Sequence, residues 1–166
     1  MTNIREKVMR EMYYRDWYKT WVRNFAINLN DIWSGKSAKI LTPMNFQESS
    51  TAIVIGKGPS IKKHQHFKLL AESNFTGTII CTDGALKSAL KEGITPTKFP
   101  KFFVVTIDPK EVIQRYYDDT IVREFGKKIN GIFSTVTDPH VINKVKDAGI
   151  KIHWTHPLFD YEEGKK

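Results

Sequence analysis

Cysteine is nearly absent from this chain of 166 residues, since Cys81 is the only one. A single cysteine excludes an intrachain disulfide framework and any metal site built from several cysteines. The five histidines show no H-x-x-x-H or H-E-x-x-H spacing, which argues against a zinc site. The expected location is therefore a reducing cytoplasm. Cys81 lies inside an apolar run and is expected to be a buried, inert core residue.

Long apolar runs and runs of like charge are also missing. No stretch approaches 18 uninterrupted apolar residues, so we expect neither a signal peptide nor a membrane span. The chain has 26 Lys and Arg against 18 Asp and Glu, which gives a net charge of +8. This surplus favours anionic partners such as nucleotides. Nucleic acid is disfavoured as a partner, because no zinc-finger spacing or aromatic RNA-binding signature accompanies the charge.

The first part of the chain has a helical pattern. Apolar and aromatic residues recur at three- to five-residue steps from Ile4 to about Trp33, which predicts two helices with a break near Asp16 or Asn24. A polar connector is expected to follow, through Ser50. Residues 1–50 are therefore expected to be an N-terminal helical segment and connector.

Short β-branched and apolar runs alternate with helical patterns in the remainder. Strands are expected at 51–55, 77–81, 102–107, 129–134 and 150–154, and helices at 60–73, 84–92, 109–118 and 139–147. Gly93 and Gly149 stand where glycine commonly ends a helix. This alternation implies parallel βαβ units with right-handed crossovers. The predicted fold class is α/β, a Rossmann-like, doubly wound, mostly parallel sheet of about five strands after the N-terminal helical segment.

The length and the 40% share of hydrophobic residues suit one compact domain. Residues 51–166 are expected to form its Rossmann-like nucleotide-binding part. The partners expected from the pattern are a small-molecule nucleotide and an acceptor, and the sequence leaves homo-oligomerisation open.

A loop with two glycines follows the first predicted strand, and it reads Gly56-Lys57-Gly58-Pro59-Ser60. Glycine has no β-carbon, so the backbone N–H groups can approach an anionic oxygen closely. The proline presets a helical φ angle, and the serine places a hydroxyl near a helix N-terminus. The loop is therefore predicted to bind nucleotide phosphates, and the alternative is a tight strand-to-helix turn without a ligand.

The glycine loop differs from two common phosphate-binding motifs. Ile61 replaces the third glycine of G-x-G-x-x-G, and no G-K-[ST] follows as in a Walker A loop. A nicotinamide-dependent dehydrogenase is therefore disfavoured.

Two aspartates follow neighbouring strands in the predicted order. Asp83 comes after the second strand and Asp108 after the third, so both are expected at the edge of the sheet where the glycine loop lies. Together they could hold Mg²⁺ against a polyphosphate and serve as catalytic residues. Gly84 and Thr135 are expected to join the nucleotide-binding set. For each aspartate alone, the alternative is a helix N-cap.

His156 follows the fifth predicted strand and is the histidine expected at the ligand-binding edge. It is predicted to contact the substrate and to belong to the catalytic set. The alternative is an ordinary surface histidine.

Four segments together resemble a known superfamily, and they are Ala52–Ile61, Cys81–Leu86, Gly93–Pro96 and Val105–Pro109. That superfamily includes archaeal hydroxymethyl-dihydropterin diphosphokinases and the flagellin glycosyltransferases called motility accessory factors. The resemblance implies a nucleotide-binding Rossmann-like fold that uses ATP with Mg²⁺ in the first branch, or a nucleotide sugar in the second. The loop alone is also similar to that of some bacterial sialyltransferases, and thiamin pyrophosphokinases are a weaker match.

Three functions follow as expectations. The first is a Mg²⁺-dependent diphosphokinase-like transferase that acts on a hydroxymethylpterin-type acceptor. The second is a glycosyltransferase-like domain that uses a nucleotide sugar. Members of the superfamily generally continue beyond the fifth strand, whereas this sequence stops at residue 166. The third expectation is therefore a truncated, non-catalytic binding module.

Overall fold

The computed structural model describes residues 4–12, 17–41 and 51–156. Its helical elements are α1 (Ile4–Met12), α2 (Tyr18–Ser34), η2 (Ala38–Leu41), α3 (Ser60–Lys63), α4 (His66–Glu72), α5 (Asp83–Lys91), η3 (Glu111–Tyr116), α6 (Thr120–Phe125), η4 (Gly126–Lys128) and α7 (Pro139–Asp147). Its strands are β1 (Lys36–Ser37), β2 (Ala52–Ile55), β3 (Thr78–Thr82), β4 (Phe102–Thr106), β5 (Asn130–Ser134) and β6 (Lys151–Thr155).

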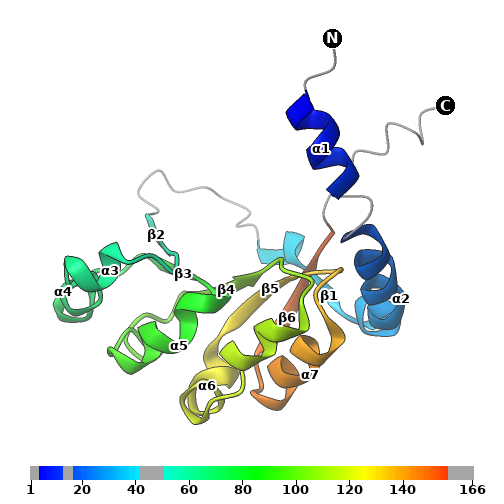
Figure 1. Cartoon of the computed structure of the whole chain (residues 1–166). Helices are drawn as coiled ribbons and strands as arrows, with labels where there is room; N and C mark the ends of the chain where they lie inside the picture. The colour runs from blue at the N-terminus through cyan, green and yellow to red at the C-terminus, as the bar shows by residue number, and fades with distance from the viewer. Residues whose placement is uncertain (1–3, 13–16, 42–50, 157–166) are drawn as a thin grey trace.

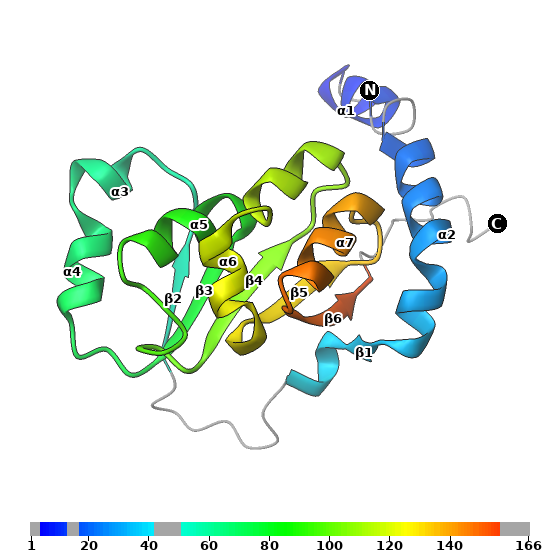
Figure 2. The same ribbon diagram turned by 90° about the horizontal axis from the view of Figure 1, so that it is seen from below.

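The described strands form one six-stranded sheet in the order β1-β6-β5-β4-β3-β2, and every pairing is parallel (Figure 1). This confirms the predicted α/β class, with one strand more than expected. Strands β2 to β6 stand in chain order, so each right-handed crossover returns to the same side of the sheet. Accordingly α5, α6 and α7 lie together on one face, in front of the strands when seen from below (Figure 2).

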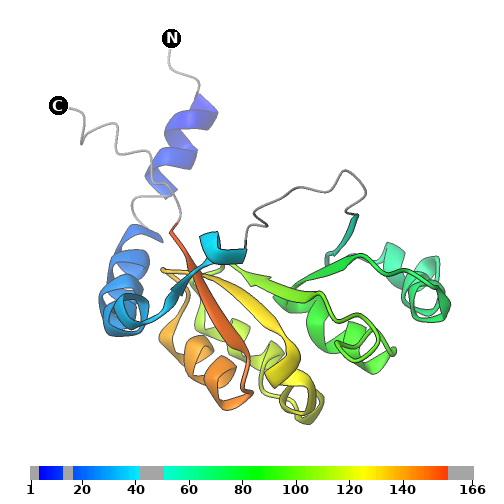
Figure 3. The same cartoon turned by 180° about the vertical axis from the view of Figure 1, so that it is seen from behind.

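The winding of the described part therefore proceeds in one direction, from β2 at one edge toward β6. Seen from behind, β1 and η2 lie at the other edge, beside β6, and α2 stands next to them (Figure 3).

None of the described helices is long and apolar enough to cross a membrane.

The core lies between the sheet and the helices α5 to α7. Alternate residues of the central strands, such as Ile79, Cys81, Phe102 and Val104, are buried, as the period of two in a strand requires. Cys81 is thus a buried core residue, as predicted, and burial raises the pKa of its thiol to about 12. The opposite face is less covered, and Val54 on edge strand β2 is 70% exposed.

Several predicted elements are confirmed almost to the residue. Helix α7 has the predicted bounds, and Asp138 caps it by accepting a hydrogen bond from the His140 backbone N–H at 2.9 Å. Gly93 and Gly149 have φ angles of +85° and +77° at the ends of α5 and α7, which is the left-handed conformation expected at these positions.

Other predicted elements differ. The helix expected at 60–73 is divided into α3 and α4, because Gln65 adopts a left-handed φ of 51° between them. The helix expected at 109–118 is the 3-10 helix η3. Of the two breaks proposed for the N-terminal helices, the one at Asn24 is wrong, since Asn24 lies inside α2. The other, at Asp16, lies outside the described residues.

Four short elements were not predicted, namely β1, η2, α6 and η4. Strand β1 has only two exposed residues, so it carries no apolar signal and is recognisable only by its pairing with β6. Helix α6 is short, but a local signal was present. Asp119 caps it by accepting a hydrogen bond from the Ile121 backbone N–H at 3.1 Å, and Lys87 approaches the same carboxylate at 2.5 Å.

We expect Gly126→Ala to lower the free energy of unfolding by about 3 kcal/mol. A β-carbon at Gly126 would lie 1.7 Å from the backbone oxygen of Ala148, so one of the two segments must move. Urea denaturation measures the change, with Gly56→Ala as the matched control because a β-carbon there meets no atom within 4 Å. Equal midpoints for the two variants would contradict the packing at Gly126.

Candidate functional site

The glycine loop, Gly56 to Ser60, connects β2 to α3 and is exposed along its whole length. Neither glycine is required by packing or by a positive φ. A β-carbon at Gly56 would meet nothing within 4 Å, and one at Gly58 would approach only the Ser60 hydroxyl, at 3.6 Å. The two glycines therefore leave open space at the surface of the loop, and its predicted role in phosphate binding stays a prediction.

The helix behind the glycine loop is shorter than expected. Because α3 has only four residues, its dipole is small, and the anion affinity of the loop would depend mainly on backbone N–H groups and on Lys57. The side chain of Lys57 points toward η3, where its Nζ atom donates a hydrogen bond to the Tyr116 hydroxyl at 3.2 Å.

The two aspartates follow neighbouring strands, as predicted. In the β3–β4 pairing Thr82 stands opposite Val105, so Asp83 and Asp108 leave the sheet at the same edge. Burial raises the pKa of Asp83, and the charge of Asp108 adds a smaller increase. Each also accepts a local backbone hydrogen bond, Asp83 from Gly84 and Asp108 from Lys110. The N-cap alternative is wrong for both, because the N-cap of α5 is Thr82 and that of η3 is Lys110. Their roles in metal binding and catalysis stay predictions.

Burial is the main influence on the Asp83 carboxyl group, and it raises the pKa. Hydrogen bonds from the Gly84 N–H and the Thr106 hydroxyl lower the pKa, and so does the charge of Lys57, but the net pKa remains above its ordinary value. Thr106 also shares a 2.5 Å hydrogen bond with the hydroxyl of Tyr117, which is fully buried. A half-buried carboxylate next to a second one would be stabilised by a cation.

Helix α2 holds the loops at this edge through two buried asparagines. The side-chain amide of Asn24 donates to the backbone oxygens of Pro109, at 2.9 Å, and of Val136, at 3.0 Å. Asn28, one turn later, donates to Thr135 at 3.3 Å and Thr137 at 2.8 Å. The loops after β4 and β5 are thereby connected to one helix.

The asparagine pair was missed at the level of sequence. Its signal was present, because Asn24 and Asn28 are spaced by four residues within an otherwise apolar stripe. Polar residues on the buried side of a helix need buried partners. Nothing local in the sequence indicates that the partners are loop carbonyls 85 to 112 residues away.

Thr135 and His156 are brought together, but apart from the aspartates. The Thr135 hydroxyl and His156 Nδ1 are 2.7 Å apart, and the His156 ring contacts Phe25 of α2. His156 follows β6 and Asp83 follows β3, so they are separated by three strand spacings, or roughly 14 Å. The predicted roles of Thr135 in nucleotide binding and of His156 in catalysis stay predictions.

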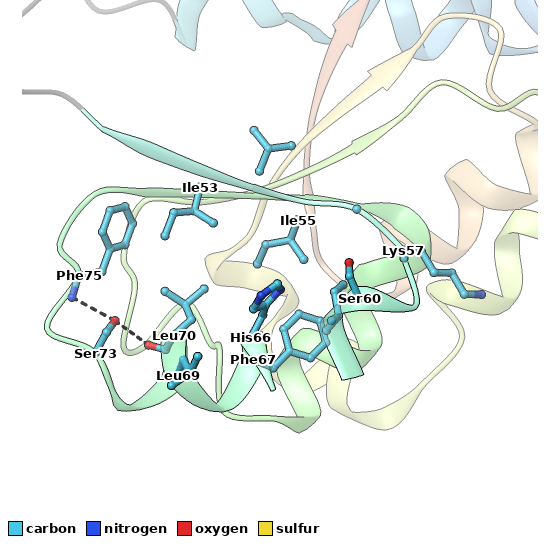
Figure 4. Close-up of a pocket in the computed structure, with 14 residues that line it drawn as sticks. Ile53, Ile55, Lys57, Ser60, His66, Phe67, Leu69, Leu70, Ser73 and Phe75 are labelled. Carbon is cyan, nitrogen blue, oxygen red and sulfur yellow. Dashed lines mark hydrogen bonds between the residues drawn. The ribbon is translucent and has the colours of Figure 1, made fainter. Parts of the chain in front are cut away.

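A cavity of about 810 Å³ lies beside the glycine loop, between β2 and α4 (Figure 4). Ile53 and Ile55 of β2 line one side, and Phe67 and Leu70 of α4 line the other. The glycine loop closes one end, and Lys57 extends away from the cavity in the figure. The volume and the largely apolar lining are in the range of small-molecule sites.

On the other side of the glycine loop is a smaller hollow of about 390 Å³. It is lined by Lys57, Gly58 and Pro59 of the loop and by Gly84 and Ala85 at the start of α5. The loop thus has one hollow on each side, a larger one at the sheet edge and a smaller one at the start of α5.

Comparison with known proteins agrees with this arrangement. Residues 23–165 match a family described as MptE-like, 6-hydroxymethylpterin diphosphokinase MptE-like. The chain belongs to the MptE-like family. The glycine loop, both aspartates and both asparagines of this MptE-like chain lie within the matched residues. The predicted resemblance is confirmed for the pterin diphosphokinase branch, and the glycosyltransferase branch stays a prediction.

A curated relative points the same way over a shorter stretch. Fifty residues are 46% identical to the 6-hydroxymethyl-7,8-dihydropterin pyrophosphokinase of Methanocaldococcus jannaschii. The aligned segment is 30% of this MptE-like chain and 21% of the relative, so it spans about a fifth of that relative's length.

We expect Asn24→Leu to lower the free energy of unfolding by about 2 kcal/mol or more, because two buried backbone carbonyls lose their donor. The matched control is Asn30→Leu, an exposed asparagine on the same helix. Urea denaturation of both variants measures the difference. Equal free energies of unfolding for the two variants would show that the hydrogen bonds of Asn24 make no net contribution to stability.

Asp83→Asn is expected to stabilise the protein at pH 7. The pKa of Asp83 is higher in the folded than in the unfolded state, so its contribution to stability is fully present below the unfolded pKa and is lost as pH rises through the folded pKa. The gain from the neutral amide should therefore shrink when urea unfolding is repeated at about pH 3.5, near or below the unfolded pKa. Asp147→Asn, on exposed α7 surface, is the control. A gain that grows at low pH would contradict the raised pKa.

Proposed function

We propose that this chain is the nucleotide-binding part of a Mg²⁺-dependent diphosphokinase that transfers diphosphate from ATP to a hydroxymethylpterin-type acceptor. The observation that carries the proposal is the common edge of the sheet, where the glycine loop and two interacting carboxylates follow neighbouring strands. Membership of the MptE-like family supports the choice of reaction.

The glycine loop would hold phosphate oxygens. Its open backbone at Gly56 and Gly58 leaves room for them, and the Lys57 ammonium group adds positive charge. Ser60 adds a hydroxyl, and Pro59 fixes the backbone angle ahead of it. The loop therefore binds and orients the phosphates of ATP, which is most of what a protein contributes to phosphoryl transfer.

Asp83 and Asp108 fit a magnesium ion in their chemistry. Both offer the hard oxygen donors that Mg²⁺ prefers, and mutual repulsion makes a cation between them favourable. The described residues contain no cluster of three or more acidic, histidine or cysteine side chains that could hold a metal. Two carboxylates are sufficient, because Mg²⁺ commonly takes its other ligands from substrate phosphates and water. When bound, Mg²⁺ would neutralise charge on the phosphate oxygens.

The apolar cavity beside the glycine loop is the proposed place for a planar ring, either the base of the nucleotide or the acceptor. Its aromatic and aliphatic walls exclude water from a ring face, while Ser60, His66 and Ser73 bring polar groups to the lining. An apolar site for a ring beside a polar site for phosphates suits a substrate that contains both a ring and a phosphate chain.

Asp108→Asn tests the metal role. Wild-type protein should show a Mg²⁺-dependent rise in melting temperature with ATP, because a ligand that binds only the folded state stabilises it. The variant should fold normally. Its affinity for ATP in the presence of Mg²⁺ should fall by at least about tenfold, because loss of a residue that only orients a metal ligand already costs that much, and Asp108 would be a ligand itself. Diphosphate transfer to 6-hydroxymethyl-7,8-dihydropterin should fall with it.

The control is Asp147→Asn, which lies far from the glycine loop at the end of α7. Unchanged Mg²⁺-dependent binding in Asp108→Asn would remove the metal role. A thermal shift only with CMP- or UDP-linked sugars would indicate glycosyl transfer, and ATP binding without turnover over a set of acceptors would indicate a binding module.

A further inference from the structure

Two cations converge on one phenol oxygen close to the glycine loop. The Tyr116 hydroxyl accepts hydrogen bonds from Lys57 Nζ, at 3.2 Å, and from Arg115 Nη2, at 3.0 Å. Both cationic groups also lie near the face of the Tyr116 ring, 4.8 Å and 5.0 Å from its centroid. We call Lys57, Arg115 and Tyr116 the phenol cluster.

The phenol cluster reaches the smaller hollow through Lys57. Gly84, the second residue of α5, allows this approach, since a β-carbon there would lie 3.0 Å from Lys57 Cδ and 3.7 Å from Tyr116 Cζ. Lys57 and Gly84 both line that hollow. The charge of Lys57 also acts on the Asp83 carboxyl group. The cluster therefore lies beside the glycine loop and the proposed metal site.

The cations of the phenol cluster are only weakly compensated, because the Asp83 carboxylate interacts with Lys57 from beyond ion-pair distance. Within the described ranges no carboxylate lies within ion-pair distance of Lys57 or Arg115, whereas Arg123 pairs with Asp118 and Lys146 with Asp31. Holding two positive charges at one neutral oxygen is unfavourable by itself, because the charges repel each other. An anion between them would relieve the repulsion.

The hydrogen-bonding pattern of the cluster also fits an anion. Lysine and arginine can only donate, so Tyr116 accepts from both and its own O–H remains available to donate. The two donated bonds lower the pKa of Tyr116, the one from Arg115 most, and so make its O–H a stronger donor. The cluster thus presents donors only, and phosphate oxygens accept only.

We propose that Lys57, Arg115 and Tyr116 bind one phosphate group of the substrate's polyphosphate chain, in addition to the phosphate held by the backbone of the glycine loop. The ligand class is a nucleoside diphosphate or triphosphate. This inference rests on the proposed function for the identity of the nucleotide, and it adds Arg115 and Tyr116 to the residues that touch it.

The phosphate series AMP, ADP and ATP, together with inorganic tripolyphosphate, tests the proposal. Affinities are measured by calorimetry on the full chain with Mg²⁺, for wild type, Arg115→Gln and Tyr116→Phe. Arg115→Gln should weaken ATP and tripolyphosphate by about 10-fold or more, because a charge-assisted contact is lost. Tyr116→Phe should weaken them less. The affinity for AMP should not change in either variant.

The matched control is Arg123→Gln, which removes an arginine of α6 that pairs with Asp118. A merely structural role for the phenol cluster predicts equal losses for AMP and ATP and a lower melting temperature, and that result would overturn the proposal. Wild-type affinities for ATP and tripolyphosphate in both variants would overturn it as well, as would a wild type that binds neither.

The outcome separates the two proposals. Cluster-dependent binding of tripolyphosphate without any diphosphate transfer to a pterin would support the phosphate site and reject the proposed reaction. Diphosphate transfer together with unaltered affinities for ATP and tripolyphosphate in Arg115→Gln and Tyr116→Phe would support the proposed reaction and reject the phosphate site.

Discussion

The parallel pairing of β3 with β4 is the constraint on which the candidate site depends. With Thr82 opposite Val105, the chain leaves both strands at the same edge, and the next turns place Asp83 and Asp108 close enough for their charges to interact. The parallel pairing of β2 with β3 adds the glycine loop to that edge. Since parallel strands must all end on one side, a single pairing scheme brings together residues that are 25 to 50 positions apart in the chain.

Helix α2 fixes the loops at this edge through polar side chains. Turns at the ends of parallel strands expose carbonyl groups that the ladder does not satisfy. Asn24 and Asn28 supply the donors, and Asn24 connects the turn after β4 to the turn after β5. A helix formed early in the sequence thereby determines the positions of loops that come much later.

The electrostatics of this edge are divided between the two sides of the glycine loop. Toward β3 and β4 lie the carboxylates, where burial raises the pKa of Asp83. Toward η3 lie two cations that no described carboxylate neutralises. In the proposed complex, an anionic substrate and a cation bound together would satisfy both sides, which neither could do alone. Charged groups without close partners are common at functional sites, and this supports the proposed binding role of the edge.

Local patterns in the sequence were enough to predict the order of the main strands and helices, the burial of Cys81 and the glycine loop, because these depend on periodicity and on residues with distinct backbone preferences. It did not determine β1, η3 or the division of α3 from α4 at Gln65, where local signals are weak or absent. The contacts of Asn24 with Pro109 and of Lys57 with Tyr116 became apparent only in the folded chain. Those contacts depend on the crossovers that place the strands side by side. Periodicity along a chain carries no information about which distant segments a sheet will bring together.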